Sequence, residues 1–234
     1  QMSNVMPDKK FEFKRDKILF VFFSNNFMYE NKADFLSQIK KIKIFANSQE
    51  TILPLPDDVP LDIPLMFLTK KDDFEIKFSK SRIDFVKLSP DSNFDLKEWV
   101  GKLNKIISSQ LKHIGIVIYS SSSDNSDSDF SKIGKLFTSN GNDIFKVSTS
   151  DECFLRTLNL ETLDFQERNF KINESLIIGT NKSKNQLSIQ FDVNTFPAIE
   201  CTINNEFINH FIQHAFKSAD LFSNNLINKV YSDG

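Results

Sequence analysis

Runs of hydrophobic residues separated by polar turn residues divide the start of the chain into a strand, a helix and a loop. Residues 17–23 (KILFVFF) are almost continuously hydrophobic, which predicts a central strand buried on both faces. Residues 30–42 have hydrophobic residues at helical spacing, and Asn31 stands where an N-cap belongs, so we expect a short helix there. Residues 47–64 carry four prolines and predict a loop or extended crossing without a regular element.

The next segments predict a small meander of strands followed by a helix. Residues 65–70, 74–80 and 82–89 have the composition of short strands, and the polar break KKDD between the first two signals a hairpin. Residues 89–112 predict a well-defined helix, and residues 113–120 predict another strand. One stripe of this helix is hydrophobic at helical spacing: Leu96, Trp99, Val100, Leu103, Ile106, Ile107 and Leu111.

A polar segment, residues 120–129 (SSSSDNSDSD), interrupts this pattern and is the one low-complexity stretch of the sequence. We interpret it as a Ser/Asp-rich loop or linker between an N-terminal α+β half, residues 1–119, and a C-terminal α+β half, residues 130–234. The same pattern also allows one continuous domain. Within the second half we expect a helix at 130–139, strands at 143–150, 153–165, 169–180, 185–196 and 198–204, and a closing helix from 204 onward.

The order of these elements places the chain in the α+β class. We expect mostly antiparallel sheets with packed helices, arranged as two similar-sized halves. The alternation of hydrophobic and polar residues along 185–196 is typical of a half-buried antiparallel strand. The passage around Trp99 is the one strand–helix–strand sequence that could give a parallel pair.

Composition and charge restrict the class of partner and the compartment. The net charge is −2, which argues against nucleic acid as a partner. The longest hydrophobic run, Ile18–Phe23, is too short to cross a bilayer, and the polar N-terminus has no hydrophobic signal-peptide core. Cys153 and Cys201 form no CxxC pair, so we expect a reduced, cytoplasmic protein. The abundance of Phe, Lys, Asn and Ile suggests an AT-rich coding genome.

One short pattern points to metal-dependent chemistry. Asp57 follows a proline, and Glu75 and Lys77 follow later as Glu-x-Lys. This order resembles the PD-(D/E)xK signature of Mg²⁺-dependent nucleases. By that resemblance, Asp57 and Glu75 would hold Mg²⁺, and Lys77 would activate water or polarise the phosphate.

A structural explanation of the same residues is available. Phe74, Ile76 and Phe78 alternate with Glu75 and Lys77, so the charged pair is expected on the solvated face of a strand. The segment is followed by another strand where the nuclease core would have a helix. We therefore commit to no catalytic residue and no cofactor, with the nuclease and Mg²⁺ as the alternative.

The closing helix carries His210 and His214, a spacing at which two histidines can hold a metal ion. The hydrophobic stripe of this helix lies elsewhere on the wheel, roughly 150° from His210 and roughly 110° from His214 at 100° per residue. The motif H-E-x-x-H is absent, because the residues between the histidines are Phe, Ile and Gln. We expect both histidines to point away from the core and predict no metal site.

Arg156 is the candidate ligand-binding residue of the second half. It alternates with Phe154, Leu158 and Leu160 in a set that the pattern assigns to the core. A core-facing arginine needs a carboxylate partner, so we expect either a structural ion pair or an anchor for an anionic ligand.

The hairpin FEIKFSKSRIDF, the helix around Trp99, the strands FLRTLNLETL and LSIQFDV, and the closing helix together resemble a sporadically distributed family of prokaryotic proteins of about this length. In that family a late helix carries a histidine and then a Phe, a part that His214 and Phe216 would take here. The resemblance implies no defined activity, and the scattered distribution suggests mobile or defence-associated genes. From the residues themselves we predict a non-catalytic binding or interaction module whose partner is another protein or a second copy of the chain.

Overall fold

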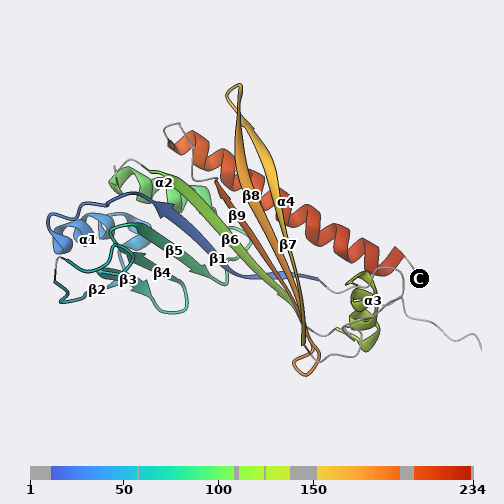
Figure 1. Cartoon of the computed structure of the whole chain (residues 1–234). Helices are drawn as coiled ribbons and strands as arrows, with labels where there is room; N and C mark the ends of the chain where they lie inside the picture. Colours follow the sequence, from blue (N-terminus) through green and yellow to red (C-terminus); the bar gives the residue numbers. More distant parts are fainter. Residues whose placement is uncertain are drawn as a thin grey trace, which may run out of the picture.

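A single sheet with helices on one side forms the described part of the chain (Figure 1). The computed structural model describes residues 12–56, 58–107, 111–123, 125–137, 152–195 and 203–232. The helices are α1 (Lys32–Lys40), the 3-10 turn η1 (Lys43–Phe45), α2 (Leu96–Ile107), α3 (Asp127–Phe137) and α4 (Asn205–Ser232). The strands are β1 (Lys14–Phe23), β2 (Gln49–Ile52), β3 (Met66–Lys70), β4 (Phe74–Phe78), β5 (Arg82–Leu88), β6 (His113–Ser122), β7 (Glu152–Phe165), β8 (Arg168–Asn181) and β9 (Gln186–Thr195).

The sheet has nine strands in the order β2-β3-β4-β5-β1-β6-β9-β8-β7, and every neighbouring pair is antiparallel. The predicted α+β class with prominent antiparallel sheet is confirmed. β1 occupies the centre, and Phe20 and Val21, whose side chains point to opposite faces, are both buried. The prediction of a central strand is confirmed, but its burial on both faces holds only in part, because Leu19 and Phe23, on the face of Val21, are half-buried.

The two halves of the chain repeat one arrangement around the β1–β6 pair. β1 and β6 lie side by side and antiparallel; β5 flanks β1, and β9 flanks β6. In each half the first strand is followed by a helix, a meander of strands and a last helix. One sheet therefore runs through both halves (Figure 1).

The Ser/Asp-rich segment 120–129 is mostly built into regular elements. Ser120–Ser122 end β6, and α3 begins at Asp127, so the connection is shorter than the expected loop or linker. Asn125 is buried in this connection, where its amide donates to the carbonyl oxygens of Ser122 and Asn185. The position expected to end the N-terminal half, residue 119, lies inside β6.

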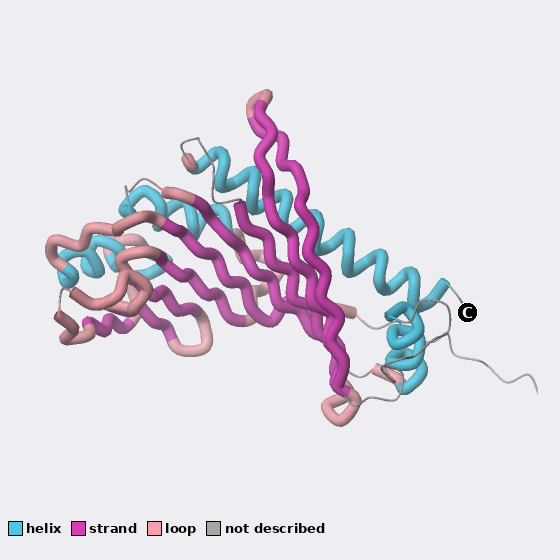
Figure 2. Tube along the Cα trace, in the orientation of Figure 1, coloured by secondary structure: helices cyan, strands magenta, loops and turns pink. Residues whose placement is uncertain are grey.

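The described helices pack on one side of the sheet (Figure 2). The main core joins the side chains of β1, β4, β5 and β6 on this side to α1, α2 and the first part of α4. A second cluster lies where α3 and the end of α4 meet β8 and β9: Phe130, Ile133, Ile178, Leu187, Ile189, Leu226 and Val230. Helix α4, 28 residues long, thus spans both clusters.

Many of the described phenylalanines pack against other aromatic rings. The ring of Trp99 on α2 lies 5.4 Å from each of Phe45 and Phe74, 5.6 Å from Phe85 and 5.5 Å from Phe94. Such edge and tilted contacts add stability beyond the buried area. The predicted hydrophobic stripe is confirmed from Leu96 to Ile107, whereas α2 begins at Leu96 and not at residue 89, and Leu111 is buried outside the helix.

The sequence pattern predicts α1 correctly but does not predict β2. The side chain of Asn31 accepts hydrogen bonds from the backbone N–H groups of Ala33 and Asp34, which confirms the predicted N-cap. The prediction of no regular element in residues 47–64 is wrong, because Gln49–Ile52 pairs with β3 as an edge strand. These four residues precede Pro54, the first proline of this segment, so each keeps a backbone N–H for the ladder. The strand expected at 143–150 lies outside the described residues, as do residues 198–202 of the last expected strand.

Candidate functional site

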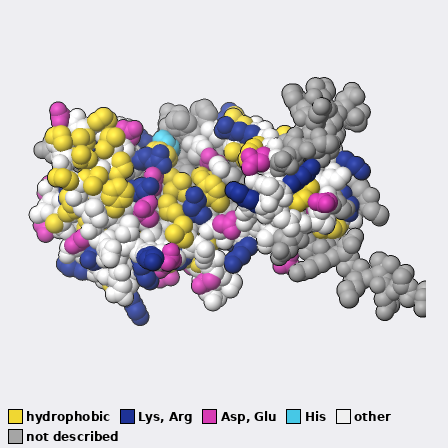
Figure 3. All heavy atoms as spheres, turned by 90° about the horizontal axis from the view of Figure 1, so that it is seen from below, with side chains coloured by type: hydrophobic (Ala, Val, Ile, Leu, Met, Phe, Trp, Pro, Cys, Tyr) yellow, Lys and Arg dark blue, Asp and Glu magenta, His cyan; other side chains and the backbone are white. Residues whose placement is uncertain are grey.

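The sheet face opposite the helices is covered by no helix of the described residues (Figure 2). Seen from below the view of Figure 1, hydrophobic side chains gather over parts of the surface with charged side chains between them (Figure 3). At the centre of this uncovered face the register places Val21 of β1 beside Gly115 of β6, and Gly115 beside Asn194 of β9. Val21 is nonetheless only 5% exposed, so the side chains around it on the same face shield it from solvent.

A hollow of about 250 Å³ lies at this point of the uncovered face. Its lining comes from five strands: Leu19, Val21 and Phe23 of β1, Arg82 of β5, His113, Gly115, Ile116 and Val117 of β6, Asn173 of β8, and Asp192, Asn194 and Thr195 of β9. Gly115 keeps it open. A Cβ added there would lie 3.5 Å from Asn194 Cβ and 3.9 Å from Phe23 Cε2, so any larger side chain would fill the space.

Aromatic rings form one wall of the hollow. Phe23 and His113 are stacked with ring centroids 4.0 Å apart and planes 19° apart, and the Arg82 guanidinium lies 5.4 Å from the Phe23 ring centroid. Burial lowers the pKa of His113, because the charged imidazolium is the form that loses most hydration. Arg82 donates to Asp84 at 2.8 Å, so its charge is already compensated.

A carboxylate and two amides form the opposite wall. Asn173 Nδ2 donates to Asn194 Oδ1 at 3.2 Å, and Asn194 in turn hydrogen bonds to Asp192. Burial raises the pKa of Asp192, while the hydrogen bond from Asn194 and the charge of Arg156 act in the opposite direction. Burial and the charge of Asp192 also raise the pKa of the nearby Tyr119 phenol. The hollow therefore combines hydrophobic walls with one carboxylate, that of Asp192, which is held in position by hydrogen bonding.

A second feature lies at the sheet edge formed by β7. Three side chains on the uncovered side of this strand are among the most exposed large hydrophobic residues of the described chain: Phe154 at 68%, Leu158 at 66% and Leu160 at 54%. No described strand pairs with the outer edge of β7. The prediction that this set faces the core is wrong, because alternation identifies residues that share a face without showing whether that face is covered.

Arg156 belongs to the same exposed set and forms no ion pair within the described part of the chain. Its Nε lies 3.4 Å from Ser175 Oγ on β8, and its charge acts on Asp192 of β9. The ion pair expected of a core arginine is not found among the described residues, and the role as an anchor for an anionic ligand stays a prediction. Arg156 therefore remains a candidate for contact with a partner.

The residues of the nuclease-like pattern are only partly described. Asp57 lies outside the described residues. Glu75 and Lys77 both point to the uncovered face, where Lys77 Nζ lies 3.1 Å from Glu75 Oε1 with both side chains partly exposed. In the described part of the chain no three His, Cys, Asp or Glu side chains gather as a metal site would require.

The histidines of α4 contact the sheet, so the prediction that both point away from the core is wrong. His214 Nε2 lies 2.8 Å from Glu174 Oε1 of β8, and the His210 ring lies 5.4 Å from the ring of Phe165 on β7. The wheel places His210 roughly 150° and His214 roughly 110° from the hydrophobic stripe, at 100° per residue. The broad sheet reaches that flank of the helix as well.

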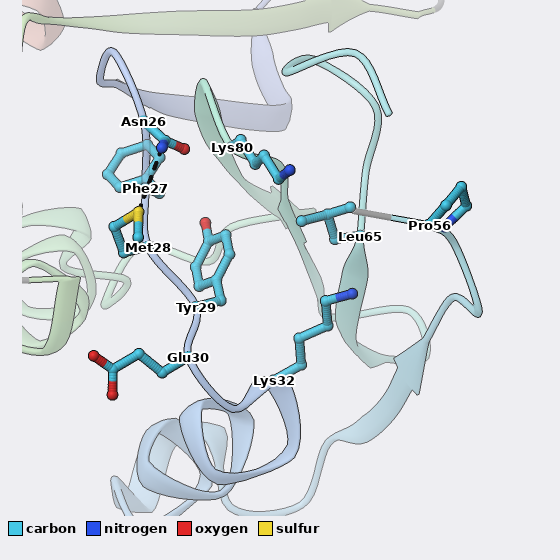
Figure 4. Close-up of a pocket in the computed structure, with 9 residues that line it drawn as sticks. All are labelled: Asn26, Phe27, Met28, Tyr29, Glu30, Lys32, Pro56, Leu65 and Lys80. Carbon is cyan, nitrogen blue, oxygen red and sulfur yellow. Dashed lines mark hydrogen bonds between the residues drawn. The ribbon is translucent and has the colours of Figure 1, made fainter. Parts of the chain in front are cut away.

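A second hollow, of about 220 Å³, lies near the start of α1 (Figure 4). Tyr29 lines one side of it, with Lys80 and Lys32 on the other, and Glu30 points away from them. The Tyr29 hydroxyl donates to the Ser79 carbonyl oxygen at 2.9 Å, and burial raises the pKa of this phenol. Tyr29 also packs on Phe35 and Phe78, so we assign it a structural role.

Comparison with known proteins adds no family assignment: neither the protein-family models nor the curated proteins give a match for this chain. The family resemblance therefore stays a prediction. No described helix is long and hydrophobic enough to cross a membrane. The uncovered face of the sheet and the outer edge of β7 are therefore the two candidate functional sites.

Proposed function

We propose that the protein is a non-catalytic interaction module that binds a second copy of itself through the outer edge of β7. The observation that carries this proposal is the exposed hydrophobic surface on an edge strand. Four of the exposed large hydrophobic residues of the described chain belong to β7: Phe154, Leu155, Leu158 and Leu160. Phe154, Leu158 and Leu160 share the uncovered face, and Leu155 points to the other face. Exposed hydrophobic surface is typical of protein-interaction sites.

The backbone of β7 offers an unusually long pairing surface. The strand has 14 residues, all of which pair with β8 on the inner side. Along its outer edge, alternate residues direct N–H and C=O groups away from the sheet. The strand contains no proline, so nothing in its sequence blocks the addition of another strand. A partner strand would satisfy these groups by extending the sheet.

Charge complementarity favours a second copy as that partner. In an antiparallel pair with Leu160 opposite Leu160 of the second copy, Arg156 stands opposite Asp164 of the second copy, and the two-fold axis repeats this contact. Residues 156, 160 and 164 are four apart, so their side chains share one face of the strand. Each such cross-strand pair contributes about 0.2–1 kcal/mol, and two charge pairs flanking a leucine pair would define the register.

The alternative of a Mg²⁺-dependent nuclease has less support. Within the described residues, Glu75 and Lys77 engage each other, and no cluster of metal ligands includes them. A protein-interaction role also agrees with the absence of a convincing catalytic pattern in the sequence. The link to mobile or defence-associated genes stays an expectation that follows from the family resemblance.

The test is the mass of the protein in solution, measured by light scattering across concentrations up to about 100 µM, where even a micromolar association is nearly complete. We expect twice the chain mass of 27.0 kDa. Leu160→Lys places two ammonium groups at the proposed two-fold axis and should yield the monomer. The matched control is Leu221→Lys, because Leu221 on α4 is 58% exposed, close to the 54% of Leu160.

Two outcomes would contradict the proposal. One is a wild-type protein that stays monomeric over the whole concentration range. The other is a Leu160→Lys variant that associates as strongly as the Leu221→Lys control. Circular dichroism of both variants checks that the added charge has not changed the fold.

A further inference from the structure

We propose that the hollow on the uncovered face binds a small aromatic amine, with its protonated nitrogen on the carboxylate of Asp192 and its ring over Gly115 beside Phe23. This site is separate from the β7 edge and does not depend on self-association. The inference rests on three features: the shape of the hollow, the aromatic wall that a ligand ring would contact, and the negative charge of the Asp192 carboxylate.

The shape suits a compact, flat molecule. The hollow has a volume of about 250 Å³ and opens on the side of the sheet that no described helix covers. Its floor at Gly115 is backbone, flanked by Val21 on β1 and by Val117 on β6. Glycine within a strand commonly marks a place where another group approaches the backbone closely. A flat ring can lie there in contact with the peptide plane.

The aromatic wall provides the contact for that ring. Phe23 leans toward Gly115, since a Cβ at Gly115 would lie 3.9 Å from Phe23 Cε2. His113, which also lines the hollow, is stacked on Phe23 and restricts the position of its ring. A ligand ring over Gly115 would meet Phe23 at the distances of ordinary aromatic pairs.

The polar wall selects a cation. Asp192 accepts the last hydrogen bond of a chain that runs from Asn173 through Asn194, and this chain fixes the carboxylate at the rim of the hollow. Burial raises the pKa of Asp192, which means that its negative charge is under-compensated where it stands. A protonated amine would restore that compensation through a charge-assisted hydrogen bond.

An anionic ligand has no comparable partner in the hollow. The Arg82 guanidinium is already bonded to Asp84 at 2.8 Å, and Lys17, on the same face, lies with its ammonium 4.1 Å from the centroid of the Tyr119 ring. Arg156 lies on the far side of Asp192, held near Ser175. The charge that faces the hollow and remains available is therefore the carboxylate.

The experiment titrates ¹⁵N-labelled protein at pH 7 with benzylamine, and with benzyl alcohol and benzoate as neutral and anionic counterparts of the same size. We expect benzylamine to shift the amide signals of Gly115 and Asp192 with a dissociation constant on the order of 1 mM, ordinary for a ligand of about eight heavy atoms. Benzyl alcohol and benzoate should bind at least about tenfold more weakly, because neither forms the charge-assisted bond.

Three variants complete the test. Asp192→Asn keeps the size of the side chain and should weaken benzylamine binding about tenfold or more. Gly115→Val fills the floor of the hollow and should abolish binding. Glu75→Gln is the matched control, because it removes a carboxylate from the same face at a residue that does not line the hollow, and it should leave binding unchanged.

Several results would overturn the inference. Equal affinity for benzylamine and benzyl alcohol would remove the role of the charge. Undiminished binding by Asp192→Asn would also show that the carboxylate has no role. That result does not depend on Gly115→Val, a change in a central strand that can disturb the fold. Benzylamine-dependent shifts confined to residues away from the hollow would place the ligand elsewhere.

Discussion

His214 Nε2 lies 2.8 Å from Glu174 Oε1, and this contact joins the middle of α4 to β8. Both side chains are mostly buried, with 26% of His214 and 14% of Glu174 exposed. The contact therefore lies between the long helix and the sheet, where water competes only weakly for the same groups. It explains why a histidine stands on this flank of the helix without invoking a metal.

Removing this contact should destabilise the protein. His214→Ala leaves the Glu174 carboxylate without its partner, so we expect the free energy of unfolding to fall by on the order of 1 kcal/mol. His210→Ala is the comparison, since His210 makes a ring contact with Phe165 and should cost less. Chemical denaturation measures both. A double-mutant cycle with Glu174→Gln should return a coupling energy well above zero, and additive effects would show that the contact contributes nothing.

The N-cap of α1 gives a prediction about a local element. Asn31→Ala removes the side-chain oxygen that accepts from the N–H groups of Ala33 and Asp34, so the free energy of unfolding should fall by about 1 kcal/mol. Asn31→Asp keeps an acceptor at the same position and should retain most of the stability. If thermal denaturation finds the Ala and Asp variants equally stable, the cap is not what starts the helix.

The stacked His113 predicts a dependence of stability on pH. Burial holds its pKa in the folded protein below the value of about 6.5 that an unfolded chain has. As the pH falls below about 6.5, the unfolded state takes up a proton before the folded state does, so this residue lowers the free energy of unfolding. Above about pH 6.5 the His113 ring is neutral in both states, so it no longer lowers the free energy of unfolding. His113→Gln should therefore lose less melting temperature between pH 7.5 and pH 5.5 than the wild type, and an equal loss in both would contradict the assignment.

Charge reversal tests the register of the proposed β7 pair. Arg156→Asp places a carboxylate opposite Asp164 of the second copy and should weaken self-association, because like charges directly opposite are destabilising. The double variant, Arg156→Asp with Asp164→Arg, restores opposite charges in that register and should regain much of the affinity. Sedimentation equilibrium gives the three constants. A double variant no better than the single one would exclude this register.

Periodicity in the sequence was enough to identify most elements of the fold. The stripe of α2 around Trp99 and the hydrophobic run of β1 were read correctly, because core-facing residues must follow the period of their element. β2 was missed because its pairing depends on the free edge of β3, which is a relation between segments. The same limit explains Arg156: alternation grouped it with Phe154 and Leu158, and only the sheet order shows that their face is uncovered.

Local patterns were not sufficient to predict the candidate site. The hollow combines Phe23, Arg82, His113 and Asp192, which are far apart along the chain and meet through strand order. One signal was present in the sequence: Gly115 interrupts the β-branched run Ile114–Ile118, and such a glycine often marks a close approach. Glu75 and Lys77, which the sequence did single out, make an ion pair with each other.

Self-association through the edge of β7 is the central claim, and hydrogen–deuterium exchange of the β7 amides at two protein concentrations tests it most directly. At sub-micromolar concentration the outward-facing amides of residues 154–164 should exchange rapidly, because no described strand pairs with that edge. At about 100 µM the same amides should become protected, while those of β2 at the opposite edge should not change. Exchange of the β7 amides that is independent of concentration, or protection that develops at β2, would contradict the claim.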